Sequence, residues 1–290
     1  MRIRHSDEMD YAVVSGHRTG DITFKRMMQG DPEALDNFEL SLVRNRGAYY
    51  TPRHRHNFDQ IRLVLEGEFS YADKKVMKSG DAGFFPEGTY YGPQNVTDCT
   101  TLVLQCGAPS RSGYLDYTTL GEGHRELTRL GSFDNGVFTR GPGANLPGTR
   151  RKQDGYEAIW EYKRGQEIAY PPARYSEPVI MNVASFEWEP SGTDGVERRL
   201  LGTFINETRM VIYRLEPGAR LDIDASEACQ LVFVLSGTGR STAGDWRRWD
   251  ALAADRGECA ELTASAPAEV FVMGLPRIAA VETERTRRVA

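Results

Sequence analysis

Two of the five histidines in the sequence, His54 and His56, are separated by a single residue. In an extended chain alternate side chains share a face, so His54, His56, Gln60 and Arg62 would project together. Neutral imidazoles are common ligands of Fe, Zn, Mn, Ni and Cu, and a glutamine can add a carbonyl oxygen. His54, His56 and Gln60 are therefore candidate ligands of one divalent transition metal, whose identity stays open. The alternative is a chance pair of solvated histidines in a polar loop.

Arg62 follows Gln60 on the same face of the expected strand, so a cation would point into the same interior. Burying a bare charge costs free energy, and Arg62 therefore needs a partner. It could bind a substrate carboxylate through two parallel hydrogen bonds, or it could pair with a buried Asp or Glu. Asp59 points to the opposite face and is expected in solvent.

The elements that must position these residues are short strands. Gly and Pro interrupt the chain at short intervals, and the runs between them are rich in Val, Ile, Phe, Tyr and Leu, which is typical of an all-β sandwich or barrel. The sequence also contains an internal repeat: Gln60–Gly67 matches Gln230–Gly237, and Gly80–Gly88 matches Trp249–Gly257. The preserved order and spacing predict a duplicated β domain.

We therefore expect three parts: an N-terminal barrel over residues 1–110, a connector over 111–175 and a C-terminal barrel over 176–290. The N-terminal barrel carries the candidate metal site. The connector contains several Gly and Pro residues and is expected to be long and irregular, packing across both barrels. Its best helical pattern, Tyr114–Leu130, contains two glycines and predicts only one or two short turns.

The histidine segment and the segment after it carry a family resemblance. Gly47 and the run His54-x-His56-x3-Gln60-x6-Gly67 resemble the first cupin motif, G(x)5HxH(x)3–4E(x)6G. Downstream, Gly80-x5-Pro86-x-Gly88-x2-Tyr91 resembles the second, G(x)5PxG(x)2H. Together with the repeat, the resemblance implies a bicupin: two tandem double-stranded β-helix (jelly-roll) barrels, similar in size to quercetinase-like enzymes.

Two positions depart from the cupin pattern. Gln60 stands where the family usually has a carboxylate, so the set lacks negative charge and should hold a divalent metal more weakly. Tyr91 stands where the family has its third histidine. It could ligate as a phenolate if the metal lowers its pKa, or its hydroxyl could bind substrate and carry a proton as a general acid–base.

The second copy of the repeat lacks these residues. Asp224 and Ser226 stand where the first copy has its two histidines, Ala260 stands in the place of Tyr91, and no histidine follows His124. We therefore expect the C-terminal barrel to bind no metal and to have a structural or dimerising role.

The resemblance implies a metal-dependent small-molecule enzyme, and a dioxygenase-like oxidoreductase acting on an organic acid, enol or aromatic substrate is the leading expectation. Tyr91 and Arg62 are its catalytic candidates. The alternatives are a metal-dependent isomerase or cyclase and a non-catalytic binding protein with a degenerate metal site. The aromatic residues nearby either line the substrate cavity or form barrel core; they are Phe58, Phe84, Phe85, Tyr90 and Tyr91.

Composition excludes other classes. The chain has 36 Lys and Arg against 41 Asp and Glu, with no basic stripe that could follow a phosphate backbone, so we expect no nucleic-acid partner. Its apolar runs are too short to cross a membrane. The start of the chain has no apolar signal segment and the four cysteines are sparse, which favours a cytoplasmic protein with reduced thiols. A small-molecule substrate and a homodimer are the expected partners.

Overall fold

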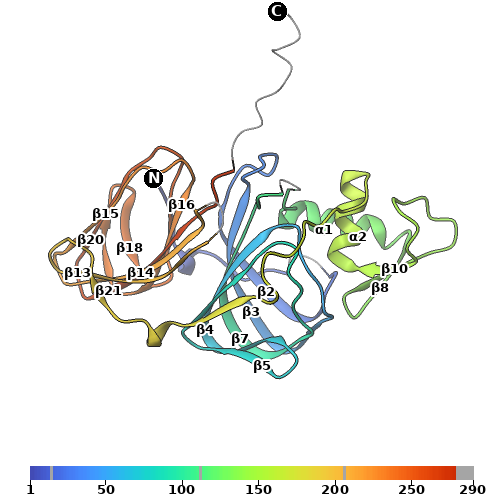
Figure 1. Ribbon diagram of the computed structural model, residues 1–290, viewed down its shortest axis with the longest axis horizontal. Coiled ribbons are helices and arrows are strands. Elements are labelled where there is room, and N and C mark those ends of the chain that lie inside the picture. Colours follow the sequence, from blue (N-terminus) through green and yellow to red (C-terminus); the bar gives the residue numbers. More distant parts are fainter. Residues whose placement is uncertain (14–15, 111–112, 205–206, 279–290) are drawn as a thin grey trace, which may run out of the picture.

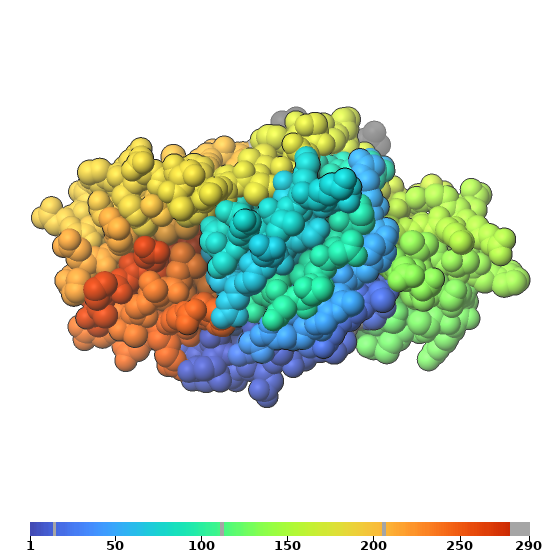
Figure 2. Space-filling view, turned by 90° about the horizontal axis from the view of Figure 1, so that it is seen from below, coloured from blue at the N-terminus to red at the C-terminus, as the bar shows by residue number. Residues whose placement is uncertain are grey.

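The structure is a computed structural model that describes residues 1–13, 16–110, 113–204 and 207–278. Two β barrels lie side by side, and a smaller, partly helical unit lies on the side of the N-terminal barrel away from the C-terminal one (Figure 1). The same three parts adjoin one another on the surface seen in Figure 2. The all-β jelly-roll architecture predicted from the sequence is confirmed. Neither described α-helix is long and apolar enough to cross a membrane.

One strongly curved sheet makes the N-terminal barrel, in the order β11-β6-β4-β7-β3-β2, with β5 paired to β4. Its three longest strands run through the whole barrel and alternate between an inner and an outer face. The strands are β2 (Thr19–Gln29), β3 (Phe38–Thr51), β4 (Asp59–Ala72), β5 (Lys75–Lys78), β6 (Asp81–Phe85), β7 (Gln94–Cys106) and β11 (Val179–Asn182).

Two sheets make the C-terminal barrel, in the orders β1-β19-β16-β21-β14-β13-β12 and β15-β20-β17-β18. The first sheet contains β1 (Arg2–Arg4), β12 (Glu189–Pro190), β13 (Val196–Thr203), β14 (Arg209–Leu215), β16 (Gln230–Ser236), β19 (Ala251–Ala254) and β21 (Ala268–Gly274). The second contains β15 (Arg220–Ile223), β17 (Thr238–Ser241), β18 (Gly244–Arg247) and β20 (Ala260–Ala264). Short 3-10 turns lie at Ser6–Glu8 and Val183–Ser185.

Sheet membership crosses the predicted domain boundaries twice. β1, at the start of the chain, pairs with β19 and so adds an edge strand to the C-terminal barrel. β11, which follows the connector, pairs with β6 and adds an edge strand to the N-terminal barrel. The two barrels therefore each hold a strand from the other's half of the sequence.

The two repeat copies occupy equivalent positions in their sheets. Gln60 on β4 pairs with Phe85 on β6, and Gln230 on β16 pairs with Ala254 on β19. The repeat found in the sequence thus corresponds to one strand register used twice.

An apolar interface joins the barrels and decides which side chains face inward. Ile61 and Leu63 of β4 belong to the same buried cluster as Leu231 and Phe233 of β16. Since side chains alternate along a strand, the residues of β4 that alternate with Ile61 and Leu63, among them Arg62, face the interior of the N-terminal barrel. This is the face predicted from the sequence.

The connector is more regular than predicted. It forms helices α1 (Tyr117–Leu127) and α2 (Gly155–Arg164) and a small sheet of β8 (Gly131–Asp134), β9 (Val137–Arg140) and β10 (Lys152–Asp154). A Cβ on Gly123 would lie 2.6 Å from Cγ2 of Ile159, so glycine lets the helices pack closely. The apolar cluster of its helices includes Phe24 and Phe58 of the N-terminal barrel and no described residue of the C-terminal one. Tyr175, at the end of the connector, packs against the cluster that joins the two barrels.

Candidate active site

A cavity of about 70 Å³ lies inside the N-terminal barrel, where the connector covers the barrel's open end. A single buried water needs roughly 10–15 Å³, so the cavity accommodates a molecule of several non-hydrogen atoms. Its wall combines residues from the barrel strands and from both connector helices. The predicted residues His54, His56, Arg62 and Tyr91 all line it, whereas Gln60 is buried beside Arg62 and does not line the wall.

A short backbone bridge brings the two predicted motifs together. His54 and Tyr91 exchange backbone hydrogen bonds of 2.9 Å in each direction, which places the first motif directly beside the last residue of the second. The His54 and His56 side chains are buried, and their ring centroids are 4.9 Å apart. Nδ1 of His54 lies 2.7 Å from the Pro52 carbonyl oxygen, to which it donates, so Nε2 of this imidazole is left for a ligand.

His56 and Tyr91 form the second polar contact of the site. Tyr91 Oη lies 3.0 Å from Nδ1 of His56, so one hydrogen bond joins the phenol and the imidazole. Burial lowers the pKa of His54 to about 3 and lowers the pKa of His56 as well. Burial also raises the pKa of Tyr91. All three side chains are therefore neutral near pH 7, which is the state in which imidazole ligates a metal.

Gln60 and Arg62 are paired with each other. Nε of Arg62 donates to Oε1 of Gln60 at 2.7 Å, and Nε2 of Gln60 has no partner within the described chain. The Arg62 guanidinium also lies over the Phe69 ring, 4.4 Å from its centroid. No described Asp or Glu forms an ion pair with Arg62. The internal ion pair considered from the sequence is therefore absent from the described residues.

These donors fit part of a metal site. Both imidazoles hold Nδ1 in a hydrogen bond, which leaves both Nε2 atoms for a divalent transition metal. Gln60 Oε1 has a second lone pair, although the Arg62 cation already occupies the first. The described residues contain no group of three or more His, Cys, Asp or Glu that could hold a metal. Among the predicted ligands, the site therefore offers two good donors and one compromised oxygen.

The aromatic residues separate into different roles. Phe58 and Tyr91 line the cavity, and Phe58 stacks on His56 with ring centroids 4.3 Å apart. Phe84 instead faces the C-terminal barrel and stacks on Phe204, also at 4.3 Å. Phe85 belongs to a buried cluster at the end of the cavity. Of the predicted aromatic set, only Phe58 and Tyr91 thus line the cavity, and a role in substrate binding stays a prediction.

The sequence did not reveal the residues that the connector brings to the cavity. Arg18, just before β2, donates to Asp154 at 2.5 Å, and Asp154 also caps α2 by accepting from the backbone N–H of Tyr156. Arg18 and Tyr156 line the cavity. Arg18 and Asp154 are 136 residues apart. No local spacing could therefore have indicated this pair.

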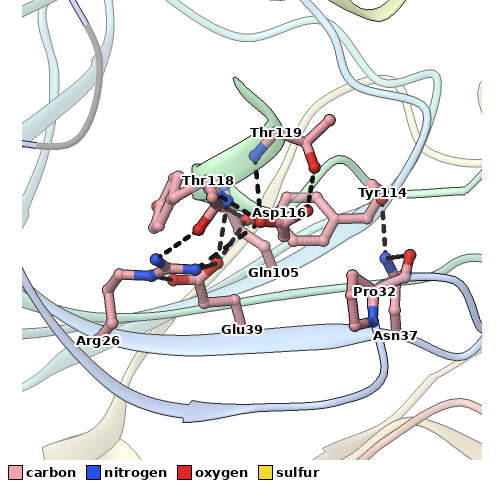
Figure 3. Close-up of polar contacts among 10 residues, drawn as sticks. Arg26, Pro32, Asn37, Glu39, Gln105, Tyr114, Asp116, Thr118 and Thr119 are labelled. Atoms are coloured by element: carbon pink, nitrogen blue, oxygen red, sulfur yellow. Dashed lines mark hydrogen bonds and ion pairs between the residues drawn. The ribbon is translucent and has the colours of Figure 1, made fainter. Parts of the chain in front are cut away.

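A buried polar network forms around Glu39, next to residues that line the cavity (Figure 3). Glu39 accepts from Nε of Arg26 at 2.5 Å and from the backbone N–H of Tyr117 at 3.2 Å. The Tyr114 hydroxyl donates to Oε1 of Gln105 at 2.8 Å. Tyr114, Tyr117 and Gln105 line the cavity, so this network holds the start of α1 against the barrel.

Asp59 is buried, which corrects the expectation that it lies in solvent. Its side chain is 1% exposed, and Oδ1 accepts from the backbone N–H of Glu87 at 2.9 Å. Burial raises the pKa of Asp59 to about 7. The turn at Pro86–Gly88 closes over this carboxyl group, a long-range contact that strand alternation alone does not reveal.

The equivalent end of the C-terminal barrel has a pocket whose described lining contains other polar residues, among them Arg209, Tyr213 and Asp224, and no histidine. The amide of Gln230 donates to the Asp224 backbone oxygen at 2.6 Å, and Oγ of Ser226 accepts from the backbone N–H of Ala228. The residues that replace the two histidines therefore serve local turns. Metal-free status of this barrel stays a prediction.

Comparison with known proteins identifies the fold. No family model and no curated protein sequence matches the chain. Among solved structures, a point variant of oxalate decarboxylase from Bacillus subtilis aligns with a TM-score of 0.56 at 12% identity, over 97% of this chain and 78% of the other. A provisionally assigned dioxygenase from Nostoc punctiforme aligns with a TM-score of 0.55 at 11% identity, over 93% and 90%. At such identities the likeness shows the fold alone, and that fold is the cupin fold.

Proposed function

We propose that the N-terminal barrel is the active site of a metal-dependent small-molecule enzyme of the cupin type. The observation that carries this proposal is the convergence of two buried, neutral imidazoles, a phenol and an arginine on one cavity. Such a combination offers metal ligation, proton transfer and charge recognition within one enclosed site. The equivalent end of the C-terminal barrel also has a pocket with an arginine and a phenol, Arg209 and Tyr213, but no histidine is among the described residues that line it.

His54 and His56 would hold the metal through their Nε2 atoms, because each Nδ1 is already engaged. Gln60 is the proposed third ligand, through the lone pair of Oε1 that Arg62 does not use. When bound, the metal would act as a Lewis acid for a substrate oxygen or support O₂ chemistry, depending on its identity. Oxalate decarboxylase of Bacillus subtilis contains Mn(II) centres, which is one precedent within this fold.

Tyr91 is the proposed proton carrier. If His56 donates its Nδ1 proton to Tyr91 Oη across their 3.0 Å contact, the phenol hydrogen remains free to point at a substrate oxygen. Burial raises the pKa of Tyr91, so this hydroxyl keeps its proton until a substrate atom becomes basic enough to take it. Phe58 and the connector's Tyr156 form ring contacts with His56 and restrict water around the pair.

Within this class, a dioxygenase-like oxidoreductase is our leading proposal and an isomerase or cyclase the next. Structural likeness to the Nostoc punctiforme protein supports the first at the level of fold only. A second candidate is a non-catalytic binding protein. The hydrogen bond that commits Gln60 Oε1 to Arg62 favours it, because this bond weakens the third ligand.

Metal content tests the proposal. Untagged wild-type protein, the double variant His54→Ala/His56→Ala and the control His124→Ala would be analysed by inductively coupled plasma mass spectrometry after reconstitution. His124 lies on α1 against Phe133 and does not line the cavity. We expect about one equivalent of metal in the wild type and the control, and none in the double variant. Equal metal content in all three folded proteins would overturn the assignment.

Catalysis is then separated from binding with a panel of organic acids and enols, using an oxygen electrode for oxidation and chromatography of the products for isomerisation or cyclisation. Turnover that His54→Ala abolishes would support the enzyme. Binding of the same compounds without turnover in metal-loaded wild type would favour the binding protein.

A further inference from the structure

We propose that the interior of the N-terminal barrel contains a carboxylate-binding subsite formed by Arg62, Gln94 and Asn45, and that its ligand is a compact organic acid. This inference rests on the proposed function for the position of the reacting centre, beside His54 and His56. It narrows the substrate from acid, enol or aromatic compound to a small acid.

Arg62 is a cation without an anion among the described residues. Its hydrogen-bond partner there is neutral: the Gln60 amide oxygen at 2.7 Å. The guanidinium lies over Phe69, 4.4 Å from the ring centroid, so a ring and an amide hold its orientation. A cation inside a protein is costly without a negative partner, and a carboxylate from the ligand would supply it in a bidentate contact.

The other arginine of the cavity shows the contrasting case. Arg18 donates to Asp154 at 2.5 Å and to the Gly136 carbonyl oxygen at 3.2 Å. Its charge is neutralised by the connector and its donors are used for structure. Of these two cations, Arg62 is therefore the one that fits an incoming anion.

Two buried amides add donors on the same cavity. Gln94 is 1% exposed and Asn45 is 2% exposed, and both line the cavity. Nε2 of Gln94 and Nδ2 of Asn45 have no hydrogen-bond partner within the described chain. A buried N–H without an acceptor costs free energy, so these donors also favour an oxygen-rich ligand. A carboxylate can accept from several such groups at once.

The size and lining of the cavity limit the rest of the ligand. Its volume is about 70 Å³, and apolar rings such as Tyr49 and Phe69 stand beside the polar groups. A carboxylate attached to a few further atoms fits this space.

The test uses two pairs of compounds that match in shape and differ in charge: acetate with acetamide, and oxamate with oxamide. Binding to chelator-treated, full-length protein would be measured by isothermal titration calorimetry. We expect the acids to bind in the millimolar range or tighter and the amides to bind much more weakly. Acids that bind no better than their amides would overturn the proposal.

Substitutions of the proposed subsite residues test which side chains bind the acid. Arg62→Gln should weaken acid binding about tenfold or more, since it removes a charge-assisted hydrogen-bond pair. Arg62→Lys keeps the charge, and it should weaken binding less and serve if Arg62→Gln does not fold. Gln94→Leu should have a smaller effect. Arg220→Gln removes an exposed arginine of the C-terminal barrel and should change nothing. Wild-type affinity in folded Arg62→Gln and Arg62→Lys would contradict the subsite.

The double variant His54→Ala/His56→Ala separates this inference from the metal proposal. We expect it to lose metal and to retain acid binding that depends on Arg62. If wild-type protein binds acids through Arg62 but never binds metal, the subsite stands and the metal proposal fails. If removal of the histidines abolishes acid binding while Arg62→Gln leaves it intact, the subsite is wrong.

Discussion

The two barrels share one strand register and differ in what fills them. Arg62 pairs with Gly83 across β4 and β6, and Val232, at the equivalent position of the C-terminal barrel, pairs with Leu252. One barrel thus places a cation beside a residue without a side chain. The other places two aliphatic side chains there, both almost fully buried in an apolar core.

A second pair of positions shows the same difference. In the C-terminal barrel Trp246 pairs with Gly239, and a Cβ on that glycine would lie 2.1 Å from Cζ2 of the indole. In the N-terminal barrel the equivalent pair is Met77 with Phe69. The indole therefore occupies interior volume in the C-terminal barrel. Backbone pairing and the outward apolar face set the register, so the interior residues can differ without a change of fold.

Exchanging the residues at one equivalent position, Arg62 and Val232, should have the largest effect on the stability of the protein. Val232→Arg would bury an unpaired cation in the filled barrel and should lower the free energy of unfolding by about 3 kcal/mol or more. The reciprocal Arg62→Val should change it by less than about 1 kcal/mol or stabilise the protein. Urea unfolding followed by circular dichroism measures both. Equal costs would mean that the two interiors do not differ as described.

The residue before Gln60 is Asp59, and the residue before the equivalent Gln230 is Cys229. We expect the stability of the protein to depend on pH through Asp59. The folded pKa of Asp59 is raised to about 7, above the unfolded value of 3.8. Between these values the folded state keeps a proton that the unfolded state releases, so stability is lost as pH rises through this range.

Asp59→Asn should remove that loss. The stability of this variant relative to wild type should increase from pH 4 to pH 7, by up to about 1.4 kcal/mol per pH unit. Chemical unfolding at a series of pH values measures the difference. A difference that is constant with pH would show that the Asp59 carboxyl group titrates normally.

Variants of Gln60, the proposed third ligand, test whether the N-terminal barrel binds metal as proposed. Gln60→Ala should weaken metal binding because it removes an oxygen donor. Gln60→Glu should retain metal or bind it about tenfold more tightly, because a carboxylate adds negative charge to the site. Competition with a metal-sensitive dye gives the affinities. Complete loss of metal in a folded Gln60→Glu protein would refute ligation at this position.

The smallest effect, on metal content, is expected for a substitution in the C-terminal barrel. Asp224→Ala should leave metal content unchanged, since the backbone oxygen of Asp224, which accepts from Gln230, is retained. Mass spectrometry of the reconstituted variant checks this. Metal content reduced by half would reveal a second site and end the distinction between the barrels.

Features that depend on local spacing could be predicted from the sequence. The His-x-His pair, the Pro-x-Gly turn before Tyr91 and the repeat are each defined by a fixed spacing along the chain. Because a strand is regular, residues at a fixed spacing lie at predictable positions in the barrel. The inward face of Arg62 followed from strand alternation in the same way. His54, His56, Arg62 and Tyr91 therefore reach the same cavity, whereas Gln60 does not line it.

The features that could not be predicted from the sequence depend on contacts between distant segments of the chain. Arg18 meets Asp154 only because the connector folds back over the barrel. Helix α1 was underestimated because Gly123 lowers helical propensity, yet the same glycine is what lets α2 approach. Asp59 was expected in solvent because alternation alone does not show that the turn beside Glu87 covers it.

A single metal site in the N-terminal barrel can be tested with an anomalous-difference map from crystals of metal-reconstituted protein, recorded at the absorption edge of the metal. We expect one strong peak per chain, within bonding distance of Nε2 of both His54 and His56, and no peak near Asp224 in the C-terminal barrel. A peak in the C-terminal barrel, or no peak between the two histidines, would contradict the assignment.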